Sequence, residues 1–126
     1  MYLLDSNVLL WFRQENEKLP KPALAMLKDP SVPVWYSVIT PWELAIKQGK
    51  GKLALPEDFF ETLPRLGFDC LPVKESHVYA LRSLHRLHGD PFDRMLAAQA
   101  KTEKLTLVTG DKRLAAYPIK TLLIGS

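Results

Sequence analysis

The sequence has a single cysteine, Cys70, so it can form neither an intramolecular disulfide nor a cysteine-based zinc site. No apolar run is long enough to span a membrane, and the first residues lack the basic leader of a signal peptide. Repeats, low-complexity segments and linkers are also missing. We therefore expect a cytoplasmic chain without a membrane partner, folded as one domain over residues 1–126, in which Cys70 is a small buried hydrophobe.

What is present is typical of a globular protein with one core. Hydrophobic residues make up 47% of the chain and charged residues 25%. The formal net charge is +3, which permits a nucleic-acid partner but does not require one.

Short apolar segments alternate with amphipathic ones along the chain. We expect strands over 2–5, 33–38, 68–73, 105–109 and 120–125, and helices over 7–13, 20–29, 41–50, 56–67, 75–89 and 90–103, with a short helix after Asp111. Because helices separate the strands, the pattern predicts an α/β fold: a parallel sheet with helices on both faces.

The stretch "GDPFDRMLAAQA" (89–100) predicts a well-capped helix. Asp90 is a favoured N-cap residue, Pro91 suits the first helical position, and Asp93 falls in the first turn. Capping alone would explain both acids, so a catalytic role for Asp93 needs support from elsewhere in the chain.

That support comes from where four acids fall relative to the predicted elements. Asp5 ends the first strand, Asp111 follows the strand at 105–109, and Glu43 and Asp93 lie in the first turns of two helices. Ligands of parallel α/β sheets bind outside the carboxyl ends of the strands, so these acids can meet at one edge. The alternative for each acid is a cap, and Glu43 would form a capping box with Thr40.

Clustered carboxylates raise one another's pKa unless a cation holds them together. A hard divalent cation such as Mg²⁺ or Mn²⁺ fits an all-oxygen ligand set. Such an ion can activate water for phosphodiester hydrolysis.

The segments "LLDSN", "PWELAIKQGKGKL", "HGDPFDRMLAAQA" and "LTLVTGDKRLAAY" resemble the four motifs of PIN-domain ribonucleases, above all the VapC-type toxins of bacterial toxin–antitoxin pairs. The resemblance implies a three-layer α/β/α fold with a short, mostly parallel sheet, and a Mg²⁺- or Mn²⁺-dependent endoribonuclease that leaves 5′-phosphate ends. It assigns Asp5, Glu43, Asp93 and Asp111 to the metal site.

The same resemblance implies supporting residues and partners. Ser6 and Thr109 match hydroxyl positions beside the acids, and Asp90 is a cap and outer group of the site. A cognate antitoxin would place a basic side chain in the acidic pocket and anchor itself around Trp11 and Phe12. A homodimer with facing active sites is also implied.

Several basic and aromatic residues have two interpretations. Lys47, Lys50 and Lys52 either form an RNA phosphate track or are solvated residues at a helix end. Arg94 either contacts the acids or phosphate or forms a surface salt bridge. His85 and His88 are weaker candidates for RNA contact or proton transfer. Trp11, Trp35 and Trp42 are assigned to the core or an interface rather than to base stacking.

The same residues argue against two other functions. A Mg²⁺-binding receiver domain needs paired acids at the first strand and a phosphoacceptor Asp later, but no Asp occurs between Asp29 and Asp58. A dehalogenase-type phosphatase needs D-x-D, where this chain has Asp5-Ser6-Asn7. A PIN-fold housekeeping ribonuclease and a non-catalytic binding domain stay open as alternatives.

Overall fold

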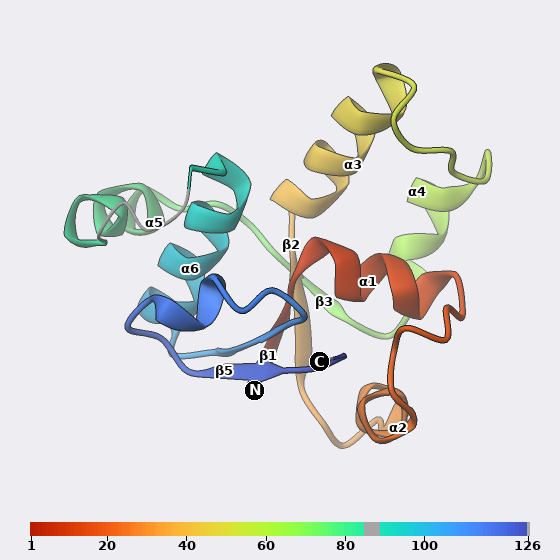
Figure 1. The fold of residues 1–126 in the computed structure, drawn as a ribbon, viewed down its shortest axis with the longest axis horizontal. Helices are drawn as coiled ribbons and strands as arrows, with labels where there is room; N and C mark the ends of the chain where they lie inside the picture. Colours follow the sequence, from red (N-terminus) through yellow and green to blue (C-terminus); the bar gives the residue numbers. More distant parts are fainter. Residues whose placement is uncertain (85–88, 126) are drawn as a thin grey trace.

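The computed structural model describes residues 1–84 and 89–125 as a central sheet with helices on both faces (Figure 1). The sheet has five parallel strands in the order β3-β2-β1-β4-β5. The strands are β1 (Tyr2–Leu4), β2 (Val34–Ser37), β3 (Asp69–Leu71), β4 (Thr106–Thr109) and β5 (Thr121–Leu123). The predicted α/β fold with a short parallel sheet is confirmed.

The helices form one layer on each face of the sheet. They are α1 (Ser6–Arg13), α2 (Lys21–Lys28), α3 (Ile39–Gly49), α4 (Phe59–Thr62), α5 (Glu75–Ala80) and α6 (Pro91–Glu103), with 3₁₀ turns η1 (Leu63–Arg65), η2 (Leu81–Ser83) and η3 (Leu114–Ala116). Side chains alternate across the strands, so Leu4 and Val108 pack with α1, α2 and α4 on one face. Leu3 and Leu107 pack with α6 on the other.

The chain order creates a switch point beside β1. The strands run outward from β1 to β2 and β3, and the chain then returns to place β4 on the other side of β1. The carboxyl ends of β1 and β4 are therefore neighbours, and the Asp5 amide donates to the Val108 carbonyl at 2.9 Å. This is the position at which parallel α/β sheets bind their ligands.

The predicted helix over 75–89 is wrong in its extent. Helix α5 ends at Ala80, the η2 turn follows, and Leu84 is extended with φ −91° and ψ 131°. Leu84 is buried in the core beside α6, so packing of this side chain ends the helical run. His85 and His88 lie outside the described residues.

Three smaller predictions also need correction. Helix α3 begins at Ile39, so Thr40 lies inside the helix and does not cap it. The predicted helix over 56–67 is reduced to α4 and the η1 turn. Cys70 is exposed rather than buried, because β3 is an edge strand.

None of the helices in the described part of the chain has both the length and the apolar character needed to cross a bilayer.

Candidate active site

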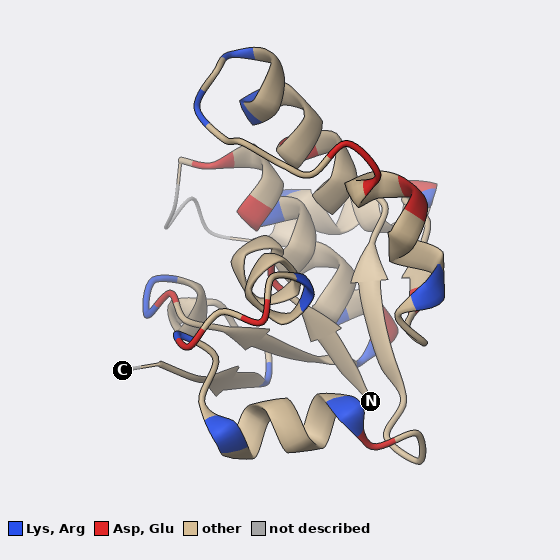
Figure 2. Ribbon diagram, turned by 90° about the vertical axis from the view of Figure 1, so that its right-hand side faces the viewer, with Lys and Arg blue, Asp and Glu red and all other residues tan. Residues whose placement is uncertain are grey.

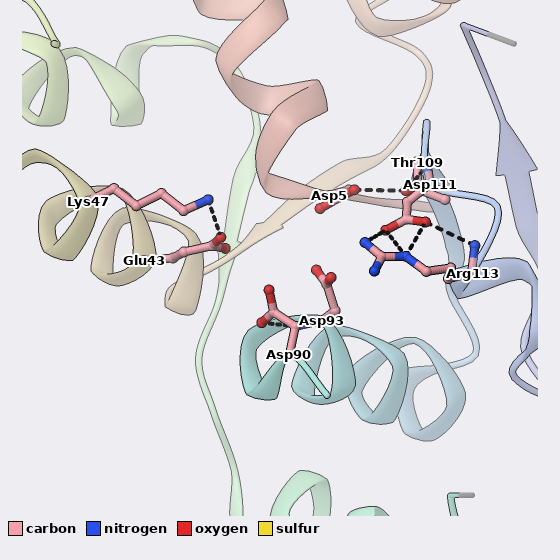
Figure 3. A network of polar contacts seen from close by, with 8 residues as sticks. All are labelled: Asp5, Glu43, Lys47, Asp90, Asp93, Thr109, Asp111 and Arg113. Carbon is pink, nitrogen blue, oxygen red and sulfur yellow. Dashed lines mark hydrogen bonds and ion pairs between the residues drawn. The ribbon is translucent and has the colours of Figure 1, made fainter. Parts of the chain in front are cut away.

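Four carboxylates from four elements surround one space at the carboxyl edge of the sheet (Figure 3). Asp5 comes from the end of β1, Glu43 from α3, Asp93 from the first turn of α6, and Asp111 from the loop after β4. The structure thus brings together the four acids that the sequence placed at one edge.

Asp5 is the most enclosed part of this cluster. Its side chain is buried, and its Oδ2 accepts a hydrogen bond of 2.7 Å from the Thr109 hydroxyl, whereas no side-chain hydrogen bond caps α1. Burial raises the pKa of Asp5, the Thr109 hydrogen bond opposes the shift, and the charges of Glu43 and Asp111 add to it. Asp5 therefore occupies the N-cap position of α1, but its side chain bonds Thr109 instead of capping the helix.

Glu43 is buried and held from both sides. Ser6 Oγ donates to Glu43 Oε1 at 2.8 Å, and Lys47 Nζ lies 2.9 Å from Glu43 Oε2. Thr40 lies within the same group, 3.2 Å from Ser6 through their hydroxyl oxygens. The capping box of Thr40 and Glu43 is absent, because Thr40 is already helical and Glu43 faces Ser6.

Asp90 and Asp93 have different roles at the start of α6: Asp90 caps the helix, and Asp93 faces the other acids. Asp90 Oδ1 accepts from the backbone amides of Phe92 at 2.8 Å and Asp93 at 3.3 Å, which confirms the predicted N-cap. The cap fixes the first turn, and the Asp93 carboxylate points toward Asp5 (Figure 3). Burial, with the charges of Asp5, Asp90, Glu43 and Asp111, raises the pKa of Asp93 to about 7.

Asp111 is positioned by Thr109 and Arg113. The Asp111 amide donates to Thr109 Oγ1 at 3.0 Å, so one hydroxyl fixes both Asp5 and the backbone of Asp111. Arg113 binds the Asp111 carboxylate through Nε and Nη2, the shortest contact being 2.9 Å. Gly110, between Thr109 and Asp111, leaves room for Trp11. A Cβ atom added at Gly110 would lie 3.2 Å from the Trp11 ring.

The donor set fits a hard divalent cation in its chemistry. Carboxylate oxygens are the ligands that Mg²⁺ and Mn²⁺ prefer. Burial, and after it the charges of the neighbouring acids, raises the pKa values of Asp5 and Asp93, so a bound cation would relieve both costs. Within residues 1–84 and 89–125, no three His, Cys, Asp or Glu side chains already form a closed ion-binding group. Binding would therefore require some carboxylates to exchange the contacts that now hold them.

A hollow of about 300 Å³ opens beside the acids, between the end of α3 and the start of α6. It is lined by Glu43, Ile46, Lys47, Lys50, Lys52, Asp90, Pro91 and Phe92. Figure 2 shows the basic positions at the end of α3, at the top of that view. Lys50 and Lys52 are exposed there, whereas Lys47 pairs with Glu43.

Arg94 makes a contact that the sequence did not predict. Its Nη2 donates to the Leu84 carbonyl at 3.5 Å, so its contact is with the segment before α6.

Arg113 and the pairing of Lys47 were missed from the sequence. The Glu43–Lys47 spacing of four on one helix is a recognisable signal for an ion pair. Arg113 gave no such signal, because a pair two residues apart depends on the turn between them. This turn is closed by the Arg113 amide, which donates to Asp111 Oδ1 at 2.9 Å.

A parallel α/β fold with clustered carboxylates at its switch point is typical of proteins that bind a ligand at the carboxyl edge of the sheet. Comparison with known sequences identifies the family. The family model of the PIN domain matches residues 2–120, so the chain belongs to the PIN domain family. A comparison with curated protein sequences gave no match.

Solved structures share the fold over nearly the whole chain. VapBC2 from Rickettsia felis, bound to a promoter DNA fragment, is 18% identical with a TM-score of 0.75, covering 98% of each chain. A toxin–antitoxin complex from Klebsiella pneumoniae is 18% identical with a TM-score of 0.68, covering 97% of this chain and 96% of that one. FitAcB from Neisseria gonorrhoeae is 25% identical with a TM-score of 0.68 and the same coverage.

The raised pKa of Asp93 predicts how the stability of the metal-free protein depends on pH. Between the unfolded value of 3.8 and the folded value of about 7, the folded state binds more protons than the unfolded one. The free energy of unfolding therefore falls as pH rises through this window. Thermal unfolding in EDTA from pH 5 to pH 8 should show wild type losing about 1–2 kcal/mol, or roughly 5 °C in Tm, relative to Asp93→Asn.

Added Mg²⁺ should restore part of this loss in wild type and less in Asp93→Asn. If Tm changes with pH by the same amount in wild type and in Asp93→Asn, the raised pKa of Asp93 does not cause the pH dependence of stability.

Proposed function

We propose that this protein is a divalent-metal-dependent endoribonuclease and the toxin of a toxin–antitoxin pair. The observation that carries the nuclease proposal is the convergence of Asp5, Glu43, Asp93 and Asp111 on one space at the switch point of a PIN-domain fold. The receiver-like alternative has no support, since the chain belongs to the PIN domain family.

In this proposal the four acids hold Mg²⁺ or Mn²⁺. When bound, the ion would polarise a phosphoryl oxygen and make hydroxide available near neutral pH. Thr109 keeps Asp5 oriented, and Ser6 does the same for Glu43 through hydrogen bonds of 2.7 and 2.8 Å. Asp90 supports the site by fixing the helical turn that presents Asp93.

Lys47 and Arg113 have a separate role in the metal-free protein. Each is a cation that already occupies one carboxylate, Glu43 or Asp111. They lower the repulsion within the cluster and are displaced, or shifted toward phosphate, when metal and RNA enter. The RNA backbone then follows the hollow past Lys50 and Lys52.

The toxin proposal rests on relatives and on a second surface. The solved structures similar to this chain are VapBC2, a toxin–antitoxin complex and FitAcB. The chain also has a hollow of about 650 Å³ between α1, α2 and the η1 turn, with Phe12, Leu19, Leu24 and Leu66 in its lining. We assign this hollow to the apolar side chains of an antitoxin segment.

The hollow lies at the end of α1 opposite the acids. Phe12 and Asp5 are seven residues apart, which corresponds to about 10 Å along the helix. A short antitoxin tail can therefore fill the hollow and place an Arg or Lys among the carboxylates. Of the expected anchors, Phe12 lines the hollow, whereas Trp11 packs on Gly110.

The homodimer is part of the same proposal. Val78 and Tyr79 on α5 are exposed by 46% and 54%, and they are the apolar side chains that we expect a second copy to cover.

The nuclease proposal predicts that Asp5→Asn and Asp93→Asn each lower RNA cleavage by at least about 100-fold while the protein stays folded. Asp69→Asn, on the exposed edge strand β3, is the charge-matched control and should cleave like wild type. Cleavage should stop in EDTA and return with Mg²⁺ or Mn²⁺. Full activity in both variants, or products that end in 2′,3′-cyclic phosphate, would contradict this mechanism.

The RNA path predicts a change in salt dependence. Replacing Lys50 and Lys52 by Ala should reduce the slope of log K against log salt by about 0.7 per lysine for single-stranded RNA. Lys101→Ala with Lys104→Ala removes the same charge from the far end of α6 and should leave the slope unchanged. Equal slopes in all three proteins would exclude Lys50 and Lys52 from the path.

The antitoxin surface is tested with Leu24→Lys, which puts a charge into the apolar hollow. Binding to the product of the adjacent gene, measured by calorimetry, should weaken at least about tenfold, because an apolar anchor is lost. RNA cleavage by the free variant should stay at the wild-type rate. Val73→Lys adds the same charge at an exposed position outside the lining of this hollow and is the control. Equal weakening by both variants would reject this hollow as the docking site.

A further inference from the structure

Two aromatic side chains pack together beside the acidic site: Trp42 is exposed, and Phe92 is partly buried. The rings of Trp42 and Phe92 pack edge to face, with centroids 5.1 Å apart and an interplanar angle of 76°. Trp42 precedes Glu43 on α3, and Phe92 precedes Asp93 on α6, so the pair joins the two helix starts that carry these acids.

The sequence analysis assigned Trp42 to the core or to an interface, and the structure excludes the core. Trp42 is 61% exposed, whereas Trp11 and Trp35 pack against the two cores of the fold. An exposed tryptophan gives up favourable burial of a large apolar surface. The contact with Phe92 fixes the orientation of the indole, while most of the Trp42 surface faces solvent.

The charges nearby identify what this surface can bind. Phe92 lines the same hollow as Lys47, Lys50 and Lys52, and that hollow adjoins Glu43 and Asp90. A row of cations next to an exposed aromatic ring is the combination used for single-stranded nucleic acid, where lysines follow the phosphates and rings stack on bases.

We propose that Trp42, supported by Phe92, is a stacking platform for an unpaired base of the RNA substrate next to the scissile phosphate. This inference rests on the proposed ribonuclease function and adds a requirement for single-stranded substrate. Trp42 acts here as a positioning residue: by holding one base, it fixes which phosphate lies among the four acids. Phe92 keeps the indole in place.

The test measures binding in EDTA, where RNA is not cleaved, with a fluorescent 12-nucleotide single-stranded RNA and its duplex as probes. Trp42→Ala should weaken binding of the single strand about 5- to 100-fold, the effect of losing one stacked base, and should change duplex binding little. Trp42→Phe should retain binding within about threefold, since the ring can still stack. Leu123→Ala, which removes an exposed apolar side chain from β5, outside the surfaces assigned to RNA and to a second copy, is the control.

Two further measurements locate the base. RNA should quench the tryptophan emission of wild type but not that of Trp42→Phe. Abasic substitutions scanned along the probe should weaken binding to wild type at one position, and at that position Trp42→Ala should cause no further loss, as expected for two partners of one contact.

The outcomes separate this inference from the proposed function. If wild type binds and cleaves RNA while Trp42→Ala binds the single strand equally well, Trp42 does not stack on a base of the RNA, and the nuclease proposal is unaffected. If Trp42→Ala instead dissociates a dimer and leaves RNA affinity per subunit unchanged, the exposed ring serves a second copy of this chain. If wild type neither binds nor cleaves any RNA, the function itself fails.

Discussion

The structure depends on how it holds four negative charges at one edge of the sheet. Asp5 is buried, and its pKa and that of Asp93 are raised by burial and by the neighbouring acids. Such a cluster is costly unless donors or cations offset it. The described contacts provide both: hydroxyls of Ser6 and Thr109, and the cations Lys47 and Arg113. Each of these contacts orients an acid while it lowers the repulsion, so the electrostatic cost is offset by the groups that give the site its shape.

The topology explains why the charges meet at all. The chain changes direction at β1, so β1 and β4 end side by side, and Asp5 and Thr109 become neighbours although 104 positions separate them. Helices α3 and α6 begin above the same edge and contribute Glu43 and Asp93. The two cores, one on each face, keep these elements fixed without involving the acids. The apolar residues thus determine how the strands and helices are arranged, and the polar residues at the strand ends determine what this arrangement can bind.

Short sequence patterns predicted those parts of the site that depend on interactions between residues close in the sequence. Asp90, followed by proline and a helix-forming run, predicted the cap of α6, and acids at strand ends predicted the convergence. The parts that failed depend on tertiary contacts. Thr40 was expected as a cap, but α3 starts one residue before it. The end of α5 is set by burial of Leu84. The bond from Arg113 to Asp111 requires the turn between them. Within residues 1–84 and 89–125, Trp42 is left 61% exposed, which no pattern in one sequence reveals.

The central claim is that the four carboxylates form a site for a divalent cation. The most direct measurement is X-ray diffraction from crystals grown with Mn²⁺, using the anomalous signal of the metal to locate it. The account predicts an anomalous peak bonded to the carboxylates of Asp5, Asp93 and Asp111, close to Glu43, with the contacts of Lys47 and Arg113 changed. Crystals of Asp5→Asn under the same conditions should lose the peak. Wild-type crystals without a peak between these acids at saturating Mn²⁺, and with Lys47 and Arg113 still bound to Glu43 and Asp111, would contradict the account.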